Sequence, residues 1–249
     1  MEKLTSRKNE YIRSLRRLAA EGDYRRERGE YLADGLKLLR EALSSGARVT
    51  SVLWRNGAEN LAGLDAAVQY LAEDELFDYA SPMKNSPGPV FTVAMPTPRA
   101  DAALENALVL ETVQDPGNVG TVIRTANALG VDAVILTGDC ADIYHPKTVR
   151  ATMGAIFRQR VVTCKLDELA PLLAANNLPL YGAALSDRAS DIRAVNVKNA
   201  AVAVGSEGRG LSSALLDVCA GEIIIPMRPC SESLNAAVAA AIIMWEMAR

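Results

Sequence analysis

The chain has 249 residues, 49% hydrophobic and 23% charged, which is typical of a globular protein with room for two domains. Its first residues lack the apolar core of a secretory signal, and its longest apolar run, residues 236–245, is too short to cross a bilayer, so we expect a cytoplasmic protein without a membrane segment. One histidine and four cysteines without CxxC spacing argue against a metal site and against a disulfide framework.

The net charge of −3 conceals an uneven distribution. Residues 1–40 contain 11 Lys and Arg against 7 Asp and Glu, whereas the rest of the chain contains 16 against 23. A basic segment on an acidic body is expected where one end of a protein touches a polyanion. A solvated helix face explains the same charges equally well.

The amino-terminal part predicts a small α/β unit. Leu32, Leu36, Leu39 and Leu43 would share one face of a helix over residues 30–44. The other predicted elements are helices over residues 6–19 and 61–71 and strands over residues 49–54 and 90–94. A polar segment containing prolines follows, so we predict domains at residues 1–97 and 107–249, joined by a linker at residues 98–106.

The second domain alternates strands with segments of helical period. We predict buried strands at residues 107–113, 133–137, 160–163, 180–184, 200–204 and 222–226. This alternation predicts an α/β fold with a mostly parallel sheet covered on both faces. Polar loops follow the first, fifth and sixth of these strands, and ligands bind outside the carboxyl ends of such strands, so one shared site is expected.

The first polar loop opens a helix. In QDPGNVGTVIRTA, Pro116 and Gly117 favour a turn, Asn118 is a candidate helix cap, and Gly130 would end the helix. Arg124 lies one and a half turns into this helix, off its apolar stripe. A helix amino terminus with a guanidinium suits an anionic or polarised group. On this loop alone, a capped helix with a solvent-facing arginine is the favoured interpretation.

The second and third loops carry further polar groups. GSEGRG places Glu207 among three glycines that permit close backbone approach, and it matches neither the dinucleotide nor the P-loop pattern. RPCSESLN brings Ser233 and Asn235 to the start of a helix that is apolar nearly all round, so this helix lies in a core or at a subunit interface. Taken singly, each loop is better explained by structure than by function.

Together, the three loops resemble a known family. DPGNVGTVIRTANALG, VGSEGRGLS and IPMRPCSESLNAAVA resemble the three motifs of the SpoU (TrmH-like) branch of the SPOUT RNA methyltransferases, over residues 106–249. LTSRKNEYIRSL and YRRERGEYLADGLKLLREAL resemble its amino-terminal RNA-binding domain, a small ribosomal-protein-like α/β/α unit. The resemblance implies a carboxyl-terminal trefoil knot that binds S-adenosylmethionine, and a homodimer.

The resemblance also assigns roles to residues. Cofactor contacts would fall at Gly205, Ile225 and Leu234, with Met227 and Ser233 beside them, and the catalytic residues would be Asn118, Arg124, Glu207 and Asn235. In the basic segment, the candidate RNA contacts are Arg7, Lys8, Arg13, Arg25 and Arg26. The chain departs from the family pattern at Arg228, Pro229 and Cys230, where proline stiffens the cofactor loop, and at Ala236 and Ala237.

The implied function is methyl transfer from S-adenosylmethionine to RNA, most often to a ribose 2′-hydroxyl, in ribosomal or transfer RNA. The donor is already activated, so alignment is the main task and no metal is needed. A guanidinium stays charged, so Arg124 would stabilise a developing alkoxide rather than accept a proton. The alternatives are a catalytically idle RNA-binding or ribosome-associated protein of the same fold, and a methyltransferase acting on a base nitrogen or a small molecule.

Overall fold

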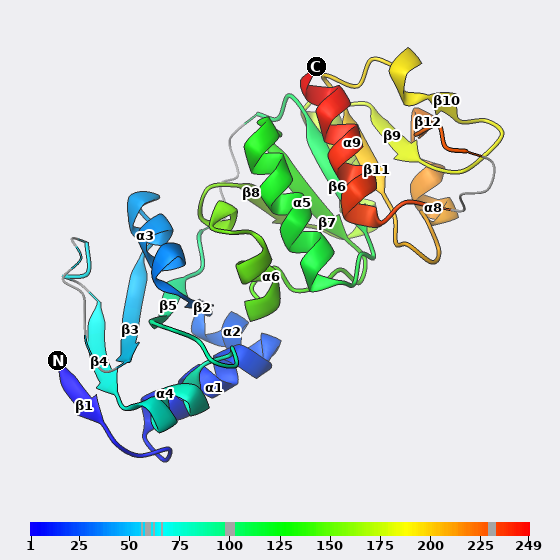
Figure 1. Ribbon diagram of the computed structural model, residues 1–249. Helices are drawn as coiled ribbons and strands as arrows, with labels where there is room; N and C mark the ends of the chain where they lie inside the picture. The colour runs from blue at the N-terminus through cyan, green and yellow to red at the C-terminus, as the bar shows by residue number, and fades with distance from the viewer. Residues whose placement is uncertain (56, 58–60, 62, 66, 98–102, 229–232) are drawn as a thin grey trace. The chain divides into compact units, whose positions relative to one another are not determined.

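The computed structural model describes residues 1–55, 57, 61, 63–65, 67–97, 103–228 and 233–249 (Figure 1). The chain forms two compact units: Met1–Thr97 with Asp142–Phe157, and Pro98–Ala141 with Arg158–Arg249. The first segment of unit 1 ends at Thr97, where the sequence analysis ended the first domain. Asp142–Phe157, which the sequence analysis assigned to the second domain, groups with the first, so the chain passes between the units three times. The predicted linker lies partly outside the described residues.

Unit 1 contains a mixed five-stranded sheet in the order β1-β4-β3-β5-β2. Strand β5 is antiparallel to β2 and β3, whereas β4 is parallel to β1 and β3. The elements are β1 (Glu2–Leu4), α1 (Glu10–Ala20), α2 (Gly22–Arg28), β2 (Glu30–Asp34), α3 (Leu36–Ser44), β3 (Val49–Arg55), β4 (Val68–Ala72), α4 (Asp74–Ala80), β5 (Val90–Ala94) and α6 (Pro146–Ala151).

Helix α1 shows how the sequence builds this unit. Its amino terminus is capped by Asn9, whose Oδ1 accepts a hydrogen bond from the amide of Tyr11 at 2.9 Å. Ile12, Leu15 and Leu18 recur every three residues and are buried on one face, in the same core cluster as residues of α4 and of the sheet.

One predicted helix of unit 1 is wrong in its first part, although α3 confirms its second part, and another is wrong where it overlaps a strand. Residues 30–44 begin as strand β2, because Gly35 has φ of 105° and breaks the chain before α3 starts at Leu36. The predicted helix at residues 61–71 overlaps β4, which is paired on both sides, with β1 and β3. In both cases tertiary strand pairing overrides a local helical pattern.

The segment Asp142–Phe157 is held in unit 1 by an ion pair between the partly buried Asp142 and the buried Arg25. Arg25 is 2% exposed, and its Nη2 lies 2.6 Å from the Asp142 carboxylate, while Nη1 donates to the carbonyl of Leu18 at 2.6 Å. The ring of Tyr144 also packs on that of Tyr31, at 4.7 Å between centroids. The Arg25 guanidinium is therefore committed to structure, which corrects its prediction as an RNA contact.

Unit 2 contains seven strands in the order β10-β12-β9-β11-β6-β7-β8, and all the recorded pairings are parallel. This confirms the predicted parallel α/β sheet and its six strands; the short β10 was not predicted. The elements are β6 (Ala107–Glu111), α5 (Pro116–Leu129), β7 (Ala133–Thr137), β8 (Arg160–Thr163), α7 (Leu166–Ala175), β9 (Leu180–Ala183), β10 (Ser190–Asp191), β11 (Ala201–Val204), α8 (Ser213–Leu216), β12 (Gly221–Ile224) and α9 (Ala236–Ala248).

Helices cover both faces of this sheet. Alternate strand residues such as Val109 and Ala203 pack with Leu169 and Leu173 of α7 and Leu215 of α8. Helices α5 and α9 lie side by side along the sheet (Figure 1) and contact β7 and β11 respectively. The trefoil knot implied by the resemblance stays a prediction. Among the described residues, none of the helices combines the length and the apolar character that crossing a membrane requires.

Removing the carboxylate of Asp142 should destabilise unit 1. In Asp142→Ala the Arg25 guanidinium stays buried without its charge partner, which costs about 3 kcal/mol. We expect the urea midpoint of unfolding to fall clearly. The double variant Arg25→Met, Asp142→Leu should recover much of the loss, since it leaves no buried charge. Asp23→Ala removes an exposed pair with Arg26 and is the matched control, with a nearly unchanged midpoint. An unchanged midpoint for Asp142→Ala would contradict this role.

Candidate functional site

Four loops of unit 2 meet at one edge of the sheet. Strands β12, β9, β11 and β6 are neighbours and parallel, so their carboxyl ends lie together. The three predicted loops follow β6, β11 and β12, and the fourth follows β9. Pro229 and Cys230, whose effect on the cofactor loop the sequence analysis raised, lie outside the described residues.

The first loop is positioned by the start of α5. Asp115, not Asn118, is the cap: its Oδ1 accepts from the Asn118 amide at 2.8 Å, and Pro116 takes the first helical position. Gly130 ends the helix in a left-handed conformation, as predicted. The correction at Asn118 matters, because its side chain is thereby left available to other partners.

Glu207 joins three of the loops. Its Oε1 accepts hydrogen bonds from Asn118 Nδ2 at 2.9 Å, from Asn235 Nδ2 at 2.5 Å and from the Ala236 amide at 3.2 Å. Asn235 Nδ2 also donates to Asn118 Oδ1 at 3.1 Å. The carboxylate therefore lies at the amino terminus of α9, where the helix dipole favours negative charge.

Asn235 has two jobs in this cluster. Its Oδ1 caps α9 by accepting from the amides of Ala237 and Val238, at 3.0 and 3.3 Å. Its amide nitrogen faces Glu207 and Asn118. One side chain thus fixes both where α9 begins and how the Glu207 carboxylate points.

The backbone at Gly205 leaves no room for a side chain. A Cβ at this position would lie 2.1 Å from the carbonyl carbon and oxygen of Gly210, because the loop folds back on itself. The amide of Gly210 donates to the carbonyl of Ser206 at 2.9 Å, which closes the turn. At the far end of the loop, buried Glu111 at the end of β6 accepts from Ser212, at 2.7 Å from its amide and 2.6 Å from its hydroxyl.

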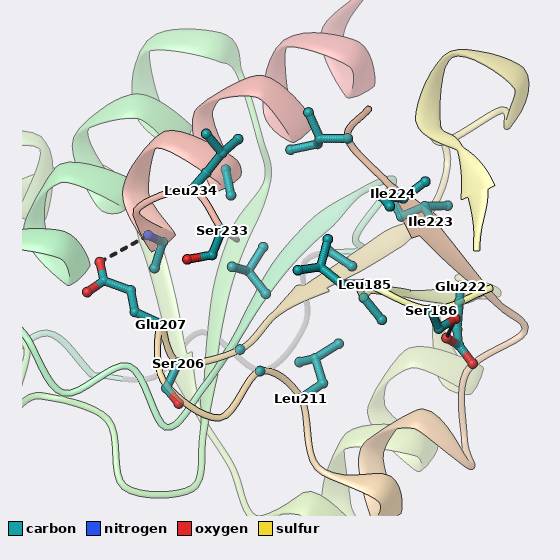
Figure 2. Close-up of a pocket in the computed structure, with 18 of the residues that line it drawn as sticks. Leu185, Ser186, Ser206, Glu207, Leu211, Glu222, Ile223, Ile224, Ser233 and Leu234 are labelled. Atoms are coloured by element: carbon teal, nitrogen blue, oxygen red, sulfur yellow. Dashed lines mark hydrogen bonds between the residues drawn. The ribbon is translucent and has the colours of Figure 1, made fainter. Parts of the chain in front are cut away.

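These loops enclose a cavity of about 550 Å³. All five residues that the resemblance assigned to the cofactor line it, together with Glu207: Gly205, Ile225, Met227, Ser233 and Leu234. Figure 2 shows Glu207 and Ser233 on one side of the cavity and Ser186 and Glu222 on the other, with Leu185 and Leu211 between them. The cavity therefore has an apolar middle and a carboxylate at each end.

The loop after β9 was missed by the sequence analysis. Leu185, Ser186 and Arg188 line the cavity, and Ser186 Oγ donates to Glu222 Oε2 at 2.5 Å. Arg188 Nη2 lies 2.7 Å from Glu222 Oε1, and the Glu222 side chain is only 10% exposed. Residues 184–189, ALSDRA, contain no motif that would have marked them as part of a site. Their position directly after a predicted strand of the same sheet was the one sequence signal that could have predicted this loop.

The three thiols that the structure describes are not candidate nucleophiles. Burial, with Glu222 and Glu111 nearby, raises the pKa of Cys219 to about 11, and its Sγ donates to the carbonyl of Leu215 at 3.3 Å. Burial also raises the pKa of Cys140 and Cys164. These groups remain neutral at physiological pH.

Arg124 lies apart from the Glu207 cluster. It is exposed on α5, six residues beyond Asn118 and so about 9 Å farther along the helix axis. It lines a shallow apolar groove between α5 and α9, with Leu129, Ile242 and Trp245. No ion pair joins its guanidinium to another residue in the described parts of the chain.

The remaining basic candidates lie in unit 1. Arg7, Lys8, Arg13 and Arg26 are exposed, in contrast to buried Arg25. The guanidinium of Arg7 lies over the ring of Tyr79, 4.8 Å from its centroid, and that of Arg16 lies over the same ring at 5.1 Å. Arg26 pairs with Asp23 on the surface.

Comparisons with known proteins agree with this architecture. The model of the SpoU rRNA Methylase family matches residues 105–245. The chain is 32% identical over 248 residues to 23S rRNA (guanosine(2553)-2′-O)-methyltransferase RlmP of Bacillus subtilis, covering 99% of each chain. That alignment extends over both units.

Two solved structures are similar over nearly the whole chain. An AdoMet-bound rRNA methyltransferase from Sinorhizobium meliloti superposes with a TM-score of 0.90 at 26% identity, covering 99% of this chain and 97% of that one. The SpoU methyltransferase AviRb from Streptomyces viridochromogenes, in complex with AdoMet, gives 0.84 at 26% identity, covering 97% and 98%. With the matching family model and the three loop motifs assembled at one sheet edge, the chain belongs to the SpoU rRNA methylase family.

Proposed function

We infer that this protein is an S-adenosylmethionine-dependent RNA methyltransferase that modifies ribose 2′-hydroxyls, and we propose ribosomal RNA as its substrate. The observation that carries the proposal is the assembly of Asn118, Glu207 and Asn235 beside a cavity lined by the five expected cofactor residues. The full-length similarity to a 23S rRNA 2′-O-methyltransferase supports the substrate class. A cytoplasmic location belongs to the same proposal.

The residues of the cavity fit S-adenosylmethionine. Leu185, Leu211 and Leu234 offer apolar contacts to a flat adenine ring, and the Glu207 carboxylate complements a positively charged ligand, whereas that of Glu222 is paired with Arg188. Gly205, Ile225 and Leu234 would hold the cofactor, with Met227 and Ser233 beside them. The cavity is large enough for a ligand of this size, within the range of about 300–1,000 Å³ typical of small-molecule sites.

In the proposed mechanism the protein mainly aligns the reactants. When bound, S-adenosylmethionine supplies a methyl group whose bond to sulfur breaks as its bond to the ribose oxygen forms. Asn118 and Asn235 fix the Glu207 carboxylate at the wall of the cavity. The resemblance assigns to Arg124, which lies apart from this cluster at the edge of the proposed homodimer interface, the stabilisation of negative charge developing on the ribose oxygen. Its guanidinium stays protonated, so the hydroxyl proton leaves to solvent water.

The basic surface of unit 1 is proposed as the RNA-binding surface. Arg7, Lys8, Arg13 and Arg26 expose positive charge, and arginine stacked on a tyrosine ring is preorganised to contact phosphates and bases. The sequence analysis predicted five RNA contacts. Arg25 is buried, so the other four remain as candidates.

The groove between α5 and α9 is proposed as the homodimer interface. Among the described residues, three of the eight exposed large apolar side chains lie on α9: Val238, Ile242 and Trp245. Trp245 is 60% exposed on a helix that is apolar nearly all round, and such a helix requires a cover. A second copy of this chain supplies an equally apolar face. Arg124 would lie at the edge of that interface.

Arg124→Ala should abolish methyl transfer without affecting cofactor binding. Losing one donor to a developing oxyanion lowers kcat by roughly 100-fold to 1,000-fold. The measurement is transfer of labelled methyl groups to ribosomal RNA, with mapping of 2′-O-methylated positions and calorimetric binding of S-adenosylmethionine. Arg193→Ala, an exposed arginine outside the cavity, is the control. Normal turnover of Arg124→Ala would exclude its catalytic role. A wild-type protein that binds RNA but transfers no methyl group would favour the idle RNA-binding alternative.

Reversing the charges of Arg7, Lys8 and Arg13 to Glu should weaken RNA binding and leave cofactor binding unchanged. Losing three phosphate contacts should reduce the slope of log K against log salt by about 2. Fluorescence anisotropy across salt concentrations measures this slope. Reversal of Lys165, Arg193 and Lys198, three exposed cations of unit 2, is the charge-matched control. An unaltered dissociation constant would show that the basic segment is an ordinary solvated surface.

Introducing charge into the groove should separate the proposed homodimer. Ile242→Glu with Trp245→Glu places two carboxylates on the apolar face, so light scattering should show the mass of a dimer for the wild type and of a monomer for the variant. Val218→Glu changes another exposed apolar residue of unit 2 and should leave the dimer intact. A monomeric wild type, or a variant that remains dimeric, would refute this interface.

A further inference from the structure

A second cavity lies beside the first in unit 2. It measures about 310 Å³ and is lined by residues 112–115, Asn118, residues 206–209 and Ala236. Residues 206–209 and Ala236 line both cavities. The loop that carries Glu207 is therefore a wall that both cavities share.

The second cavity is placed to hold the acceptor. Transfer of a methyl group by in-line displacement requires the attacking oxygen on the side of the carbon opposite to the sulfur, so donor and acceptor must occupy adjoining spaces. The second cavity adjoins the proposed donor cavity, and its volume suits a single nucleotide.

Arg209 brings an uncommitted positive charge to the shared wall. It is exposed, lines both cavities, and forms no ion pair with another described residue, although Glu207 is only two positions away. A guanidinium presents a planar fork of donors that matches phosphate oxygens. Neither the family motifs nor the Glu207 cluster gives this arginine a role.

The opposite wall is built rigidly. Gln114 Nε2 donates to Asp139 Oδ2 at 2.7 Å, and Asp115 is held at the start of α5. Thr112 has φ of 54°, a conformation that is unusual for a β-branched residue and that is found mostly at functional sites. The loop after β6 is therefore fixed in shape, as a binding surface requires.

We propose that the second cavity receives the acceptor nucleotide of the RNA and that Arg209 binds a phosphate next to its ribose. This inference rests on the proposed function. It assigns Arg209 to substrate binding.

Arg209→Ala tests the assignment. We expect the KM for ribosomal RNA to rise roughly tenfold to 100-fold, the loss of a charge-assisted hydrogen bond, with kcat changed far less. The dissociation constant of S-adenosylmethionine should stay unchanged, which also shows that the variant is folded. Arg209→Lys should recover part of the KM because it keeps the charge, whereas Arg209→Gln should not. The slope of log KM against log salt should change by about 0.7 in Arg209→Ala. Lys198→Ala removes an exposed cation outside both cavities and is the control.

The outcomes separate this inference from the proposed function. No methyl transfer by the wild-type protein would contradict the proposed function itself. Transfer by the wild type with an unchanged KM in Arg209→Ala would overturn only the assignment of the second cavity. A weaker affinity of Arg209→Ala for S-adenosylmethionine at unchanged KM for RNA would also overturn it, because Arg209 would then belong to the cofactor cavity.

Discussion

The site depends on one oxygen atom that accepts three hydrogen bonds. Oε1 of Glu207 is bound by a side chain of α5, by the cap of α9 and by the first amide of α9. These three bonds fix the positions of the loops relative to one another. A carboxylate at a helix amino terminus is also stabilised by the helix dipole, so the charge needed at the wall of the cavity strengthens the structure that holds it.

Parallel strand pairing makes this convergence possible. The strands β12, β9, β11 and β6 are adjacent in the sheet although they lie far apart in sequence, so loops separated by about a hundred residues leave the same edge. Glu111 shows how closely the sheet and the loops are connected. It is the last residue of β6, is buried, and holds the end of the Glu207 loop through Ser212. Residues of the sheet thereby set the shape of the site.

Local signals predicted unit 2 well because they agree with its fold. Pro116 and Gly130 delimit α5, and continuous apolar runs mark the buried strands. Unit 1 was predicted less well, since Leu32 follows a helical period yet lies in β2, and Gly35 divides the segment. The site residues of the three motifs were found by resemblance. The loop after β9 has no motif, and the burial of Arg25 depends on Asp142, 117 positions away, which no local pattern reveals.

The segment Asp142–Phe157 belongs to unit 1 but follows part of unit 2 in the chain, and this affects the order in which the two units can fold during synthesis. During synthesis Arg25 emerges long before Asp142, so its guanidinium has no carboxylate partner while β6, α5 and β7 are being made. Unit 1 is complete only when residue 157 has left the ribosome, after the first third of unit 2. Dividing the chain near residue 97 therefore yields two incomplete fragments. The first fragment lacks α6, and the second contains α6 without the rest of unit 1, against which that helix packs.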